Sequence, residues 1–290
     1  SFVKNINNFD CLISAAELRN RLGDNALKIY DCRFSLFDKG KGHSAYLSGH
    51  IPGASYVHLE NDLSGPITSR TGRHPIPKFD LFIERLGALG VEHGSRVVIY
   101  DEGPSAQAAR FWWLLRWVGH DNVAVLDGGF RAWETVGGTI TQGIEAYPPG
   151  AYTAQVGSFE PVEANDVAEA LSTKSGLVID ARENKRFVGE EEPLDRVAGH
   201  IPGSINRPFQ NNLEDGIFKN PEQLRGEFEE LISGGHPREV IHTCGSGVTA
   251  CHNLLAMEHC GMSGSKLYVG SWSDWITDPT RPIAGNVQNE

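Results

Sequence analysis

Long apolar runs are missing from the sequence, since none approaches the roughly 20 residues that a membrane-spanning helix needs. A basic excess is missing as well, because 26 Lys and Arg face 37 Asp and Glu, and the formal net charge is -11. A protein that binds nucleic acid usually presents a basic face, so this balance argues against such a partner. The five cysteines are odd in number and irregularly spaced, which argues against a disulfide framework and favours a reducing compartment.

The first residues lack the charged start and the apolar middle of a secretory signal, and the chain begins without Met. We therefore expect a cytoplasmic protein, or a mitochondrial one if a targeting segment has been removed. With 40% hydrophobic and 22% charged residues, the composition is that of an ordinary globular protein. The length of 290 residues suits two domains better than one.

An internal repeat is the strongest sign of how the chain is organised. His50-Ile51-Pro52-Gly53 recurs as His200-Ile201-Pro202-Gly203, roughly 150 positions later. A repeat of this period has the size of a domain and indicates a duplication. We predict a first domain over residues 1–148 and a second over 158–290, joined where Tyr-Pro-Pro-Gly interrupts the pattern. Further matches occur in the same order, 31–33 with 180–182, 96–101 with 238–244 and 126–133 with 268–275.

Short β-branched runs alternate with helical stretches in each half. Residues 97–100 and 240–242 have the pattern of buried strands, whereas residues 79–89 carry apolar side chains at helical intervals. Ser14 is followed three positions later by Glu17, the spacing of a capping box at a helix start. The alternation predicts an α/β fold, with a parallel sheet flanked by helices on both faces in each half.

Cys244 stands at the head of a glycine-rich segment. A predicted buried strand ends at Thr243, Gly245 and Gly247 follow, and a stretch compatible with a helix begins at Thr249. Such a loop directs backbone N–H groups toward one point, and the helix dipole adds positive potential there. A thiol at this point should have a lowered pKa and act as a nucleophile, and the same donors would stabilise a persulfide. The alternative from these residues alone is a structural cysteine beside a turn.

The segment 244–249, Cys-Gly-Ser-Gly-Val-Thr, resembles the active-site loop of 3-mercaptopyruvate sulfurtransferases. The two His-Ile-Pro-Gly motifs and the closing segment 270–275 resemble the wider rhodanese superfamily. The resemblance implies two tandem rhodanese-like domains, the first an inactive copy and the second catalytic. Asp101 has the position in the first copy that Cys244 has in the second.

By the same resemblance, Cys244 takes sulfur from 3-mercaptopyruvate and carries it as a persulfide. The acceptor would be a thiol, cyanide or a small redox protein such as thioredoxin. The reaction implied needs neither a metal nor an organic cofactor.

Three other functions fit parts of the sequence. Thiosulfate-preferring rhodaneses usually carry Arg and Lys at the positions of Gly245 and Ser246, and two small uncharged residues there disfavour doubly charged thiosulfate as the preferred donor. A cysteine phosphatase needs an Arg six residues after its nucleophile, and position 250 is Ala. A non-catalytic rhodanese module that binds a partner is the third alternative, and retention of Cys244 speaks against it.

The resemblance also assigns roles to residues around Cys244. Arg186 and Arg196 are the candidates for binding the substrate carboxylate, which suits a guanidinium fork that Lys cannot replace. Ser246 is a candidate proton relay, with His74 and Glu60 as acid–base partners. The simpler interpretation is a surface charge for Arg186, Arg196 and Glu60, and a loop histidine for His74. The loop residues expected to bind the substrate are Gly245, Gly247, Val248 and Thr249.

Overall fold

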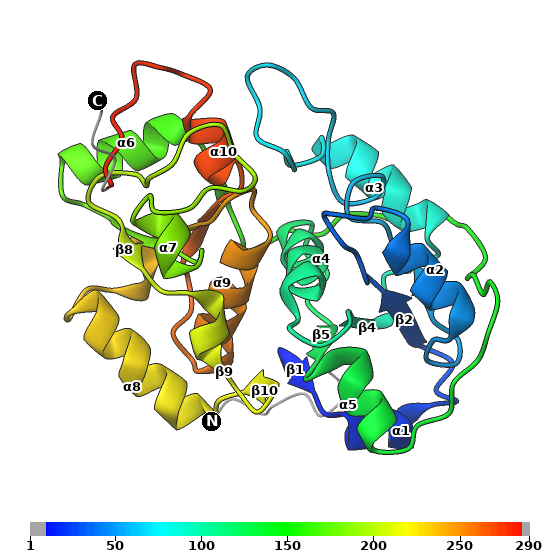
Figure 1. The fold of residues 1–290 in the computed structure, drawn as a ribbon. Coiled ribbons are helices and arrows are strands. Elements are labelled where there is room, and N and C mark those ends of the chain that lie inside the picture. The colour runs from blue at the N-terminus through cyan, green and yellow to red at the C-terminus, as the bar shows by residue number, and fades with distance from the viewer. Residues whose placement is uncertain (1–9, 286–290) are drawn as a thin grey trace. The chain divides into compact units, whose positions relative to one another are not determined.

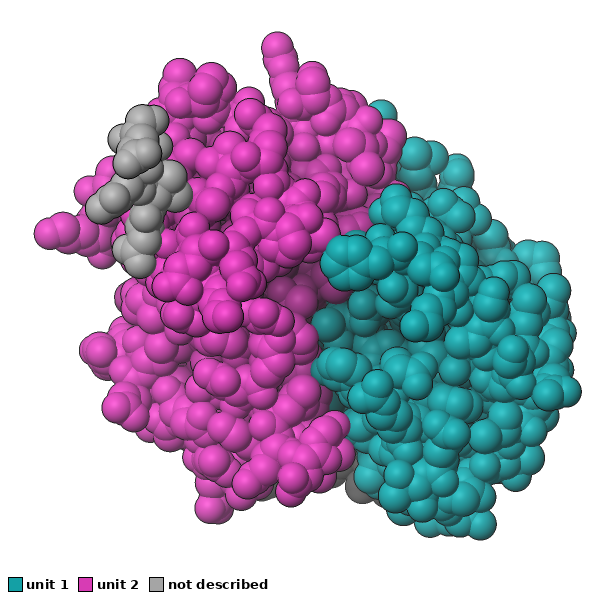
Figure 2. Space-filling model, in the orientation of Figure 1, with its two compact units in different colours: residues 1–63, 77–158 teal, residues 64–76, 159–290 magenta. Residues whose placement is uncertain are grey.

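The computed structural model of the protein describes residues 10–285, which form two compact units (Figure 1). Unit 1 comprises residues 1–63 and 77–158, and unit 2 comprises residues 64–76 and 159–290; Figure 2 shows them in teal and magenta. The ends of the two expected domains at residues 1–9 and 286–290 lie outside the described part. The segment 64–76 comes from the first half of the chain but belongs to unit 2, which a division at the linker does not anticipate.

Unit 1 is built on a five-stranded sheet in the order β1-β5-β4-β2-β3, and every pair in it is parallel. Apolar and β-branched residues make up most of the central strands, as expected for a sheet covered on both faces. The strands are β1 (Leu12–Ile13), β2 (Leu27–Asp31), β3 (Ser55–Tyr56), β4 (Arg96–Tyr100) and β5 (Val123–Leu126). The helices are α1 (Ala15–Arg21), α2 (Lys41–Ser48), α3 (Phe79–Ala88), α4 (Ala106–Trp117) and α5 (Gly129–Thr135).

Helices cover both faces of the sheet in unit 1. On one face, Val98 of β4 belongs to a buried cluster with Leu18 of α1 and Trp133 of α5. On the other face, Tyr30 of β2 contacts Phe111 of α4, with the ring centroids 5.6 Å apart. Side chains of a strand point alternately to its two faces, so these strands supply two apolar layers.

Unit 2 repeats this plan with a parallel sheet in the order β6-β12-β11-β7-β8 and a separate antiparallel pair, β9 and β10. Its strands are β6 (Pro161–Val162), β7 (Leu177–Asp180), β8 (Ile205–Asn206), β9 (Leu213–Glu214), β10 (Ile217–Phe218), β11 (Val240–Thr243) and β12 (Lys266–Tyr268). Its helices are α6 (Ala164–Ser172), α7 (Asn184–Phe187), α8 (Pro221–Ile232), α9 (Thr249–His259) and α10 (Ser271–Trp275), with short 3-10 turns η1 (Phe209–Asn212) and η2 (Pro237–Glu239).

The sheet of unit 2 is covered by α6 and α10 on one face, where Val178 and Ile241 pack with Val167 and Trp272. Helix α9 contacts β11 and β12, and α8 packs against α9. The prediction of two α/β domains with parallel sheets flanked by helices is therefore confirmed.

Several local predictions agree with the observed elements. Helix α3 fills the range expected at residues 79–89, and β4 and β11 lie at the expected buried strands. The Glu17 N–H donates to the Ser14 hydroxyl at 3.1 Å, as the capping spacing predicts. Within residues 10–285, no helix combines the length and the apolar character needed to cross a bilayer.

Candidate active site

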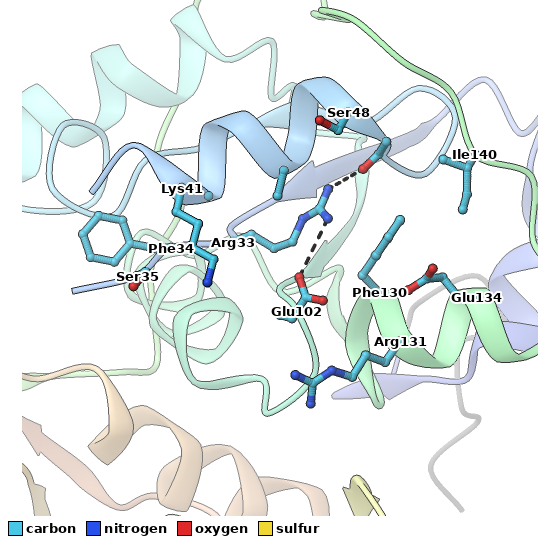
Figure 3. A pocket seen from close by; sticks show the side chains of 13 residues that line it. Arg33, Phe34, Ser35, Lys41, Ser48, Glu102, Phe130, Arg131, Glu134 and Ile140 are labelled. Atoms are coloured by element: carbon cyan, nitrogen blue, oxygen red, sulfur yellow. Dashed lines mark hydrogen bonds and ion pairs between the residues drawn. The ribbon is translucent and has the colours of Figure 1, made fainter. Parts of the chain in front are cut away.

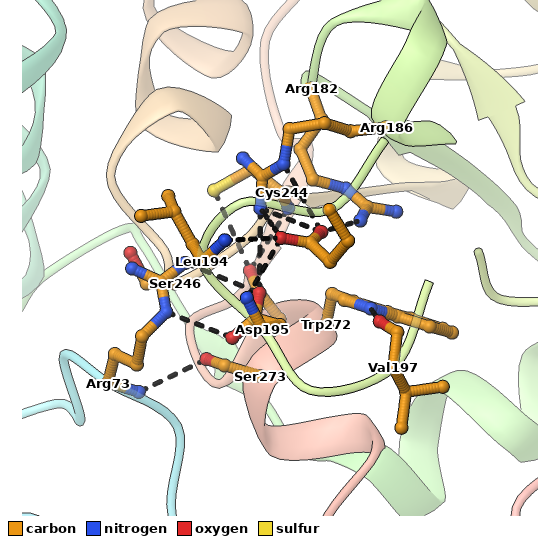
Figure 4. Close-up of polar contacts among 12 residues, drawn as sticks. Arg73, Arg182, Arg186, Leu194, Asp195, Val197, Cys244, Ser246, Trp272 and Ser273 are labelled. Carbon is orange, nitrogen blue, oxygen red and sulfur yellow. Dashed lines mark hydrogen bonds and ion pairs between the residues drawn. The ribbon is translucent and has the colours of Figure 1, made fainter. Parts of the chain in front are cut away.

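Cys244 lies at the carboxyl end of β11, in the short loop that leads into α9 (Figure 4). Its side chain is 1% exposed, and its carbonyl accepts from the Trp272 N–H at 2.9 Å. The Cys244 N–H donates to the Ser271 hydroxyl at 3.0 Å. Ligands of parallel α/β sheets bind at the carboxyl ends of the strands, so the thiol has the position expected of a catalytic group.

The sulfur of Cys244 is surrounded by hydrogen-bond donors, of which the Gly247 N–H lies 3.1 Å from Sγ. Burial raises the pKa of the Cys244 thiol, but the Thr249 hydroxyl donates to the sulfur and lowers the pKa. Three backbone N–H groups lower it further, those of Ala250, Ser246 and Gly247. The pKa therefore lies below the ordinary cysteine value, which enriches the nucleophilic thiolate.

The remaining loop residues shape this donor set. Gly247 has a φ of 87°, a left-handed conformation that glycine adopts without strain, and its N–H faces the sulfur. Val248 is 8% exposed and directly precedes Thr249, the first residue of α9. The Gly245 carbonyl accepts from the Ser273 N–H at 2.9 Å, which ties the loop to α10.

Ser246 is paired with His74, whose Nδ1 lies 2.7 Å from the Ser246 Oγ. Both side chains are buried, with exposed fractions of 7% and 1%. His74 belongs to the segment 64–76 and thus to unit 2. A hydroxyl held in this way can pass a proton between the imidazole and a group bound next to the cysteine loop.

Arg186 is held by the carboxylate of Glu192. Its Nε and Nη2 donate to Glu192 Oε1 at 3.2 and 3.0 Å. Burial raises the pKa of Glu192, but the N–H groups of Asp195 and Leu194, together with Arg186, lower it by more, so Glu192 stays ionised. A β-carbon placed on Gly245 would lie 3.2 Å from Arg186 Nη2 and 3.6 Å from Nη1, so the guanidinium is oriented toward the cysteine loop.

The structure gives Arg196 a partner outside the cysteine loop. Arg196 Nη2 donates to the carbonyl of Ile276, just beyond α10, and within residues 10–285 Arg196 makes no hydrogen bond or ion pair with the cysteine loop. Glu60 belongs to unit 1, where its carboxylate lies 2.9 Å from the Lys39 Nζ. The contacts therefore give Arg196 no place beside the thiol, and the acid–base role of Glu60 stays a prediction.

Arg73 is the second guanidinium beside the loop, and sequence reasoning missed it. A β-carbon on Gly245 would lie 2.9 Å from Arg73 Nη2. The Nε of Arg73 donates to Asp195 Oδ1 at 3.0 Å, and the backbone N–H of Arg73 donates to the Ser273 hydroxyl at 3.1 Å. The sequence carries one signal for Arg73, because it directly precedes His74, which the resemblance places in the site.

The corresponding loop of unit 1 holds a carboxylate where unit 2 holds the thiol. Asp101 Oδ1 accepts from the N–H groups of Gly103 and Ser105 at 3.1 and 2.9 Å, and Oδ2 accepts from the Ala108 N–H at 3.1 Å. A cavity of about 630 Å³ lies in the same unit, beside the buried Arg33 (Figure 3). No cysteine is among its lining residues; they include Glu102, which directly follows Asp101.

A model of the rhodanese-like domain matches the chain twice, over residues 14–135 and 163–278. The chain belongs to the rhodanese family. A curated protein of Pseudomonas aeruginosa called "Probable 3-mercaptopyruvate sulfurtransferase" is 45% identical over 276 residues, covering 94% of this chain and 97% of that protein. The thiosulfate sulfurtransferase of Bos taurus is 35% identical over 259 residues, which cover 86% of this chain and 85% of the bovine protein.

The same likeness is seen among solved structures. The 3-mercaptopyruvate sulfurtransferase from Leishmania major superposes with a TM-score of 0.83 at 27% identity, covering 96% of this chain and 76% of that one. Both rhodanese copies of the present chain are matched by the family model, but only the second has a cysteine at the loop head, because the first has Asp101 there.

Proposed function

We propose that the protein is a sulfurtransferase that moves sulfur from 3-mercaptopyruvate to an acceptor through a persulfide on Cys244. The observation that carries this proposal is the set of donors around the Cys244 sulfur, which lowers the pKa of the thiol although the side chain is buried. The 45% identity to the Pseudomonas aeruginosa protein over nearly the full length of both chains supports the choice of reaction and donor.

In the first half-reaction, the Cys244 thiolate attacks the sulfur of 3-mercaptopyruvate. An S–S bond forms and the C–S bond breaks, with its electron pair moving to the carbon as the enolate of pyruvate. The thiol proton of the donor ends on that carbon, and the products are pyruvate and a Cys244 persulfide anion. The N–H groups that hold the thiolate are then placed to hold the persulfide as well.

The residues around the loop supply orientation and proton transfer. Arg186 would bind the carboxylate of the donor with the part of its guanidinium that faces Gly245. The Ser246 hydroxyl, hydrogen-bonded to His74, would carry the proton to the enolate carbon. Glu192 acts as a positioning residue, because it touches Arg186 and orients it.

In the second half-reaction, an acceptor nucleophile attacks the outer sulfur and the Cys244 thiolate leaves. With cyanide the product is thiocyanate; with a thiol, or with a small redox protein such as thioredoxin, the acceptor becomes a persulfide. Thiosulfate is the second candidate donor, and the identity to the bovine thiosulfate sulfurtransferase favours testing it.

Peptide mass spectrometry after incubation with 3-mercaptopyruvate tests the proposal, with pyruvate release followed in parallel. We expect the mass of one sulfur atom to be added to the peptide that contains Cys244, in step with one pyruvate released, and to be removed by cyanide. The matched control is Cys11→Ser, which changes a cysteine of unit 1 and should leave both signals intact. Sulfur found on Cys251 or Cys260, or pyruvate formed without a sulfur adduct, would overturn the mechanism.

A further inference from the structure

The cavity of about 630 Å³ in unit 1 has a buried arginine in its wall (Figure 3). The side chain of Arg33 is 5% exposed. Its Nε and Nη2 donate to the Asp31 carboxylate, and Nη2 also donates to the Gly49 carbonyl at 2.6 Å. Within residues 10–285 its Nη1 donates no hydrogen bond, and this atom pairs only loosely with Glu102 Oε2 at 3.8 Å. A buried cation therefore keeps N–H donors unused beside a cavity.

The matching arginine of unit 2, Arg182, shows which chemical group suits this position. It is held as Arg33 is, by the carboxylate two residues before it and by a backbone carbonyl. Its Nη1 lies 3.6 Å from Glu192 Oε1, and the Glu192 side chain is 5% exposed. In unit 1 the partner is Glu102, whose side chain is 48% exposed. An exposed ion pair contributes little to stability, so a carboxylate from outside can displace Glu102 at low cost.

Two further cations line the same cavity. The side chains of Lys41 and Arg131 form no hydrogen bond or ion pair with any residue that the structure describes. Together with Arg33 they provide three positive charges, and Glu102 and Glu134 provide two negative ones. The excess of one positive charge favours an anion that carries a single charge.

Much of the remaining wall is apolar. The guanidinium carbon of Arg33 lies 4.3 Å from the ring centroid of Phe130, and Phe34 and Ile140 also line the cavity. Ile140 is 43% exposed, so its side chain is accessible to a ligand. Gly42 lets α2 pack against the backbone of Arg33, because a β-carbon at this glycine would overlap the Arg33 carbonyl oxygen. A cavity of this volume, with apolar walls and a few charged groups, is typical of a site for a small organic molecule.

From this arrangement we infer that unit 1 has a binding site for a small organic monocarboxylate with an apolar body. The carboxylate of the ligand replaces that of Glu102 at Arg33 Nη1, with Arg131 as a second cation, and the apolar body contacts Phe130 and Ile140. The inference does not rest on the proposed function, because all the lining residues belong to unit 1 and Cys244 belongs to unit 2. Its test therefore measures binding and not sulfur transfer.

The probe is 3-phenylpropionate, titrated into the full chain in a calorimeter at low salt. We expect one site, and we expect the neutral amide of the probe to bind about tenfold more weakly, because it loses the charge-assisted contact. Ala45→Trp puts a large side chain into the cavity from α2 and should abolish binding, with the fold checked by denaturant unfolding. Binding that persists in folded Ala45→Trp, or that is lost in Arg186→Lys, would place the probe elsewhere and overturn the inference.

A second pair of variants does not depend on filling the cavity. Glu102→Gln removes the carboxylate that competes for Arg33, so the affinity for 3-phenylpropionate should rise about two- to fivefold. The matched control is Glu17→Gln, which removes the same charge from a side chain that is 50% exposed and also paired with an arginine, and it should leave the affinity unchanged. Arg131→Gln should lower the affinity several-fold. An equal rise in Glu102→Gln and Glu17→Gln would mean that only the net charge acts, and no rise in Glu102→Gln would mean that the probe does not reach Arg33; either result would overturn the inference.

Discussion

The loops after β4 in unit 1 and after β11 in unit 2 have the same construction and hold different anions. In unit 1 three backbone N–H groups donate to the carboxylate of Asp101, and in unit 2 the N–H groups of the loop donate to the thiol of Cys244. In unit 1 the group held by the loop is a carboxylate, which cannot carry sulfur as a thiol can. The comparison teaches that the strand–loop–helix unit is an anion holder in both copies, and that the residue at the loop head decides whether it is also a catalyst.

The pKa values of Asp101 and Cys244 are shifted in opposite directions. Burial raises the pKa of Asp101 and outweighs the three N–H bonds that lower it, so this carboxyl group has a pKa above its usual value. Burial also raises the pKa of Cys244, but the hydrogen bonds of its loop outweigh burial and the pKa is lowered. The Thr249 hydroxyl is among these donors, whereas the first residue of α4 in unit 1 is Ala106 and has no hydroxyl.

Replacing Cys244 by Asp would make the second loop resemble the first, and this change should have the largest effect. The carboxylate can accept from the loop N–H groups but cannot carry sulfur, so we expect transfer to fall below detection while unit 2 stays folded. Pyruvate release and thiocyanate formation measure the activity, and hydrogen exchange in β11 and α9 measures the fold. Activity that persists in Cys244→Asp would show that another cysteine carries the sulfur.

Arg186 marks a second difference between the copies. Four residues after Arg182 comes Arg186, and four residues after the matching Arg33 comes Phe37, whose side chain is 83% exposed. Arg186→Lys keeps the charge but loses the fork, so kcat/KM for 3-mercaptopyruvate should fall about tenfold or more. Transfer from preformed persulfide to cyanide involves no carboxylate and should change much less. Equal losses in the two half-reactions would assign Arg186 to the support of the loop.

A third difference lies at the start of the helix that follows the last strand of each sheet. Gly129 in unit 1 has a φ of 61°, and Ser271 in unit 2 has a φ of 58°, which is strained for a residue with a β-carbon. The Ser271 hydroxyl accepts the Cys244 N–H at 3.0 Å, so the strained residue holds the head of the cysteine loop. Ser271 thus keeps a backbone conformation that glycine would adopt more easily, and its hydroxyl gains the hydrogen bond from the Cys244 N–H.

The matched variants are Ser271→Gly and Ser271→Ala. Both remove the hydroxyl, so both should slow the alkylation of Cys244 and the first half-reaction by several-fold. Only the glycine relieves the backbone, so Ser271→Gly should be more stable than Ser271→Ala by about 1 kcal/mol in denaturant unfolding. If the two variants are equally stable, the backbone at position 271 is not strained; if both react like the wild type, the hydroxyl does not position the loop.

The sequence allows the two copies, their sheets and the cysteine loop to be predicted, because each depends on local patterns. Hydrophobic periods locate the strands, the repeat locates the domains, and the glycines beside Cys244 indicate the loop. The docking of the segment 64–76 onto unit 2 depends on tertiary contacts of Gly72 and His74, for which no sequence period exists.

The carboxylates that hold the site arginines were not predictable for the same reason. Glu192 lies in an irregular segment, and its partner Arg186 is known only once that segment is folded. The resemblance makes Arg196 a candidate for binding the substrate carboxylate, but its guanidinium donates to the Ile276 carbonyl. Inside helices and strands, the spacing of residues predicts well in which direction their side chains point. It predicts this poorly in a segment such as 188–198, which contains neither a helix nor a strand.

The smallest expected difference between the two copies is the response of their His-Ile-Pro-Gly turns to low pH. In unit 1, His50 Nε2 lies 2.6 Å from Glu145, whereas in unit 2 His200 stacks on Phe187 with the centroids 3.8 Å apart. Burial raises the pKa of Glu145, but hydrogen bonds from His50, the Gly53 N–H and the Thr141 hydroxyl lower it by more.

Because the pKa of Glu145 is depressed in the folded state, its contribution to stability is present above the usual glutamate pKa and is lost as the pH falls through the folded value. The carboxylate is 40% exposed, so the effect should be below about 1 kcal/mol. We expect Glu145→Gln to speed hydrogen exchange around residues 50–53 at neutral pH, and this difference from the wild type should shrink once Glu145 is protonated in acid. The turn at 200–203 serves as the internal control and should exchange alike in both proteins. A difference that is the same at neutral and acid pH would mean that the shape of Glu145, and not its charge, holds the turn of unit 1.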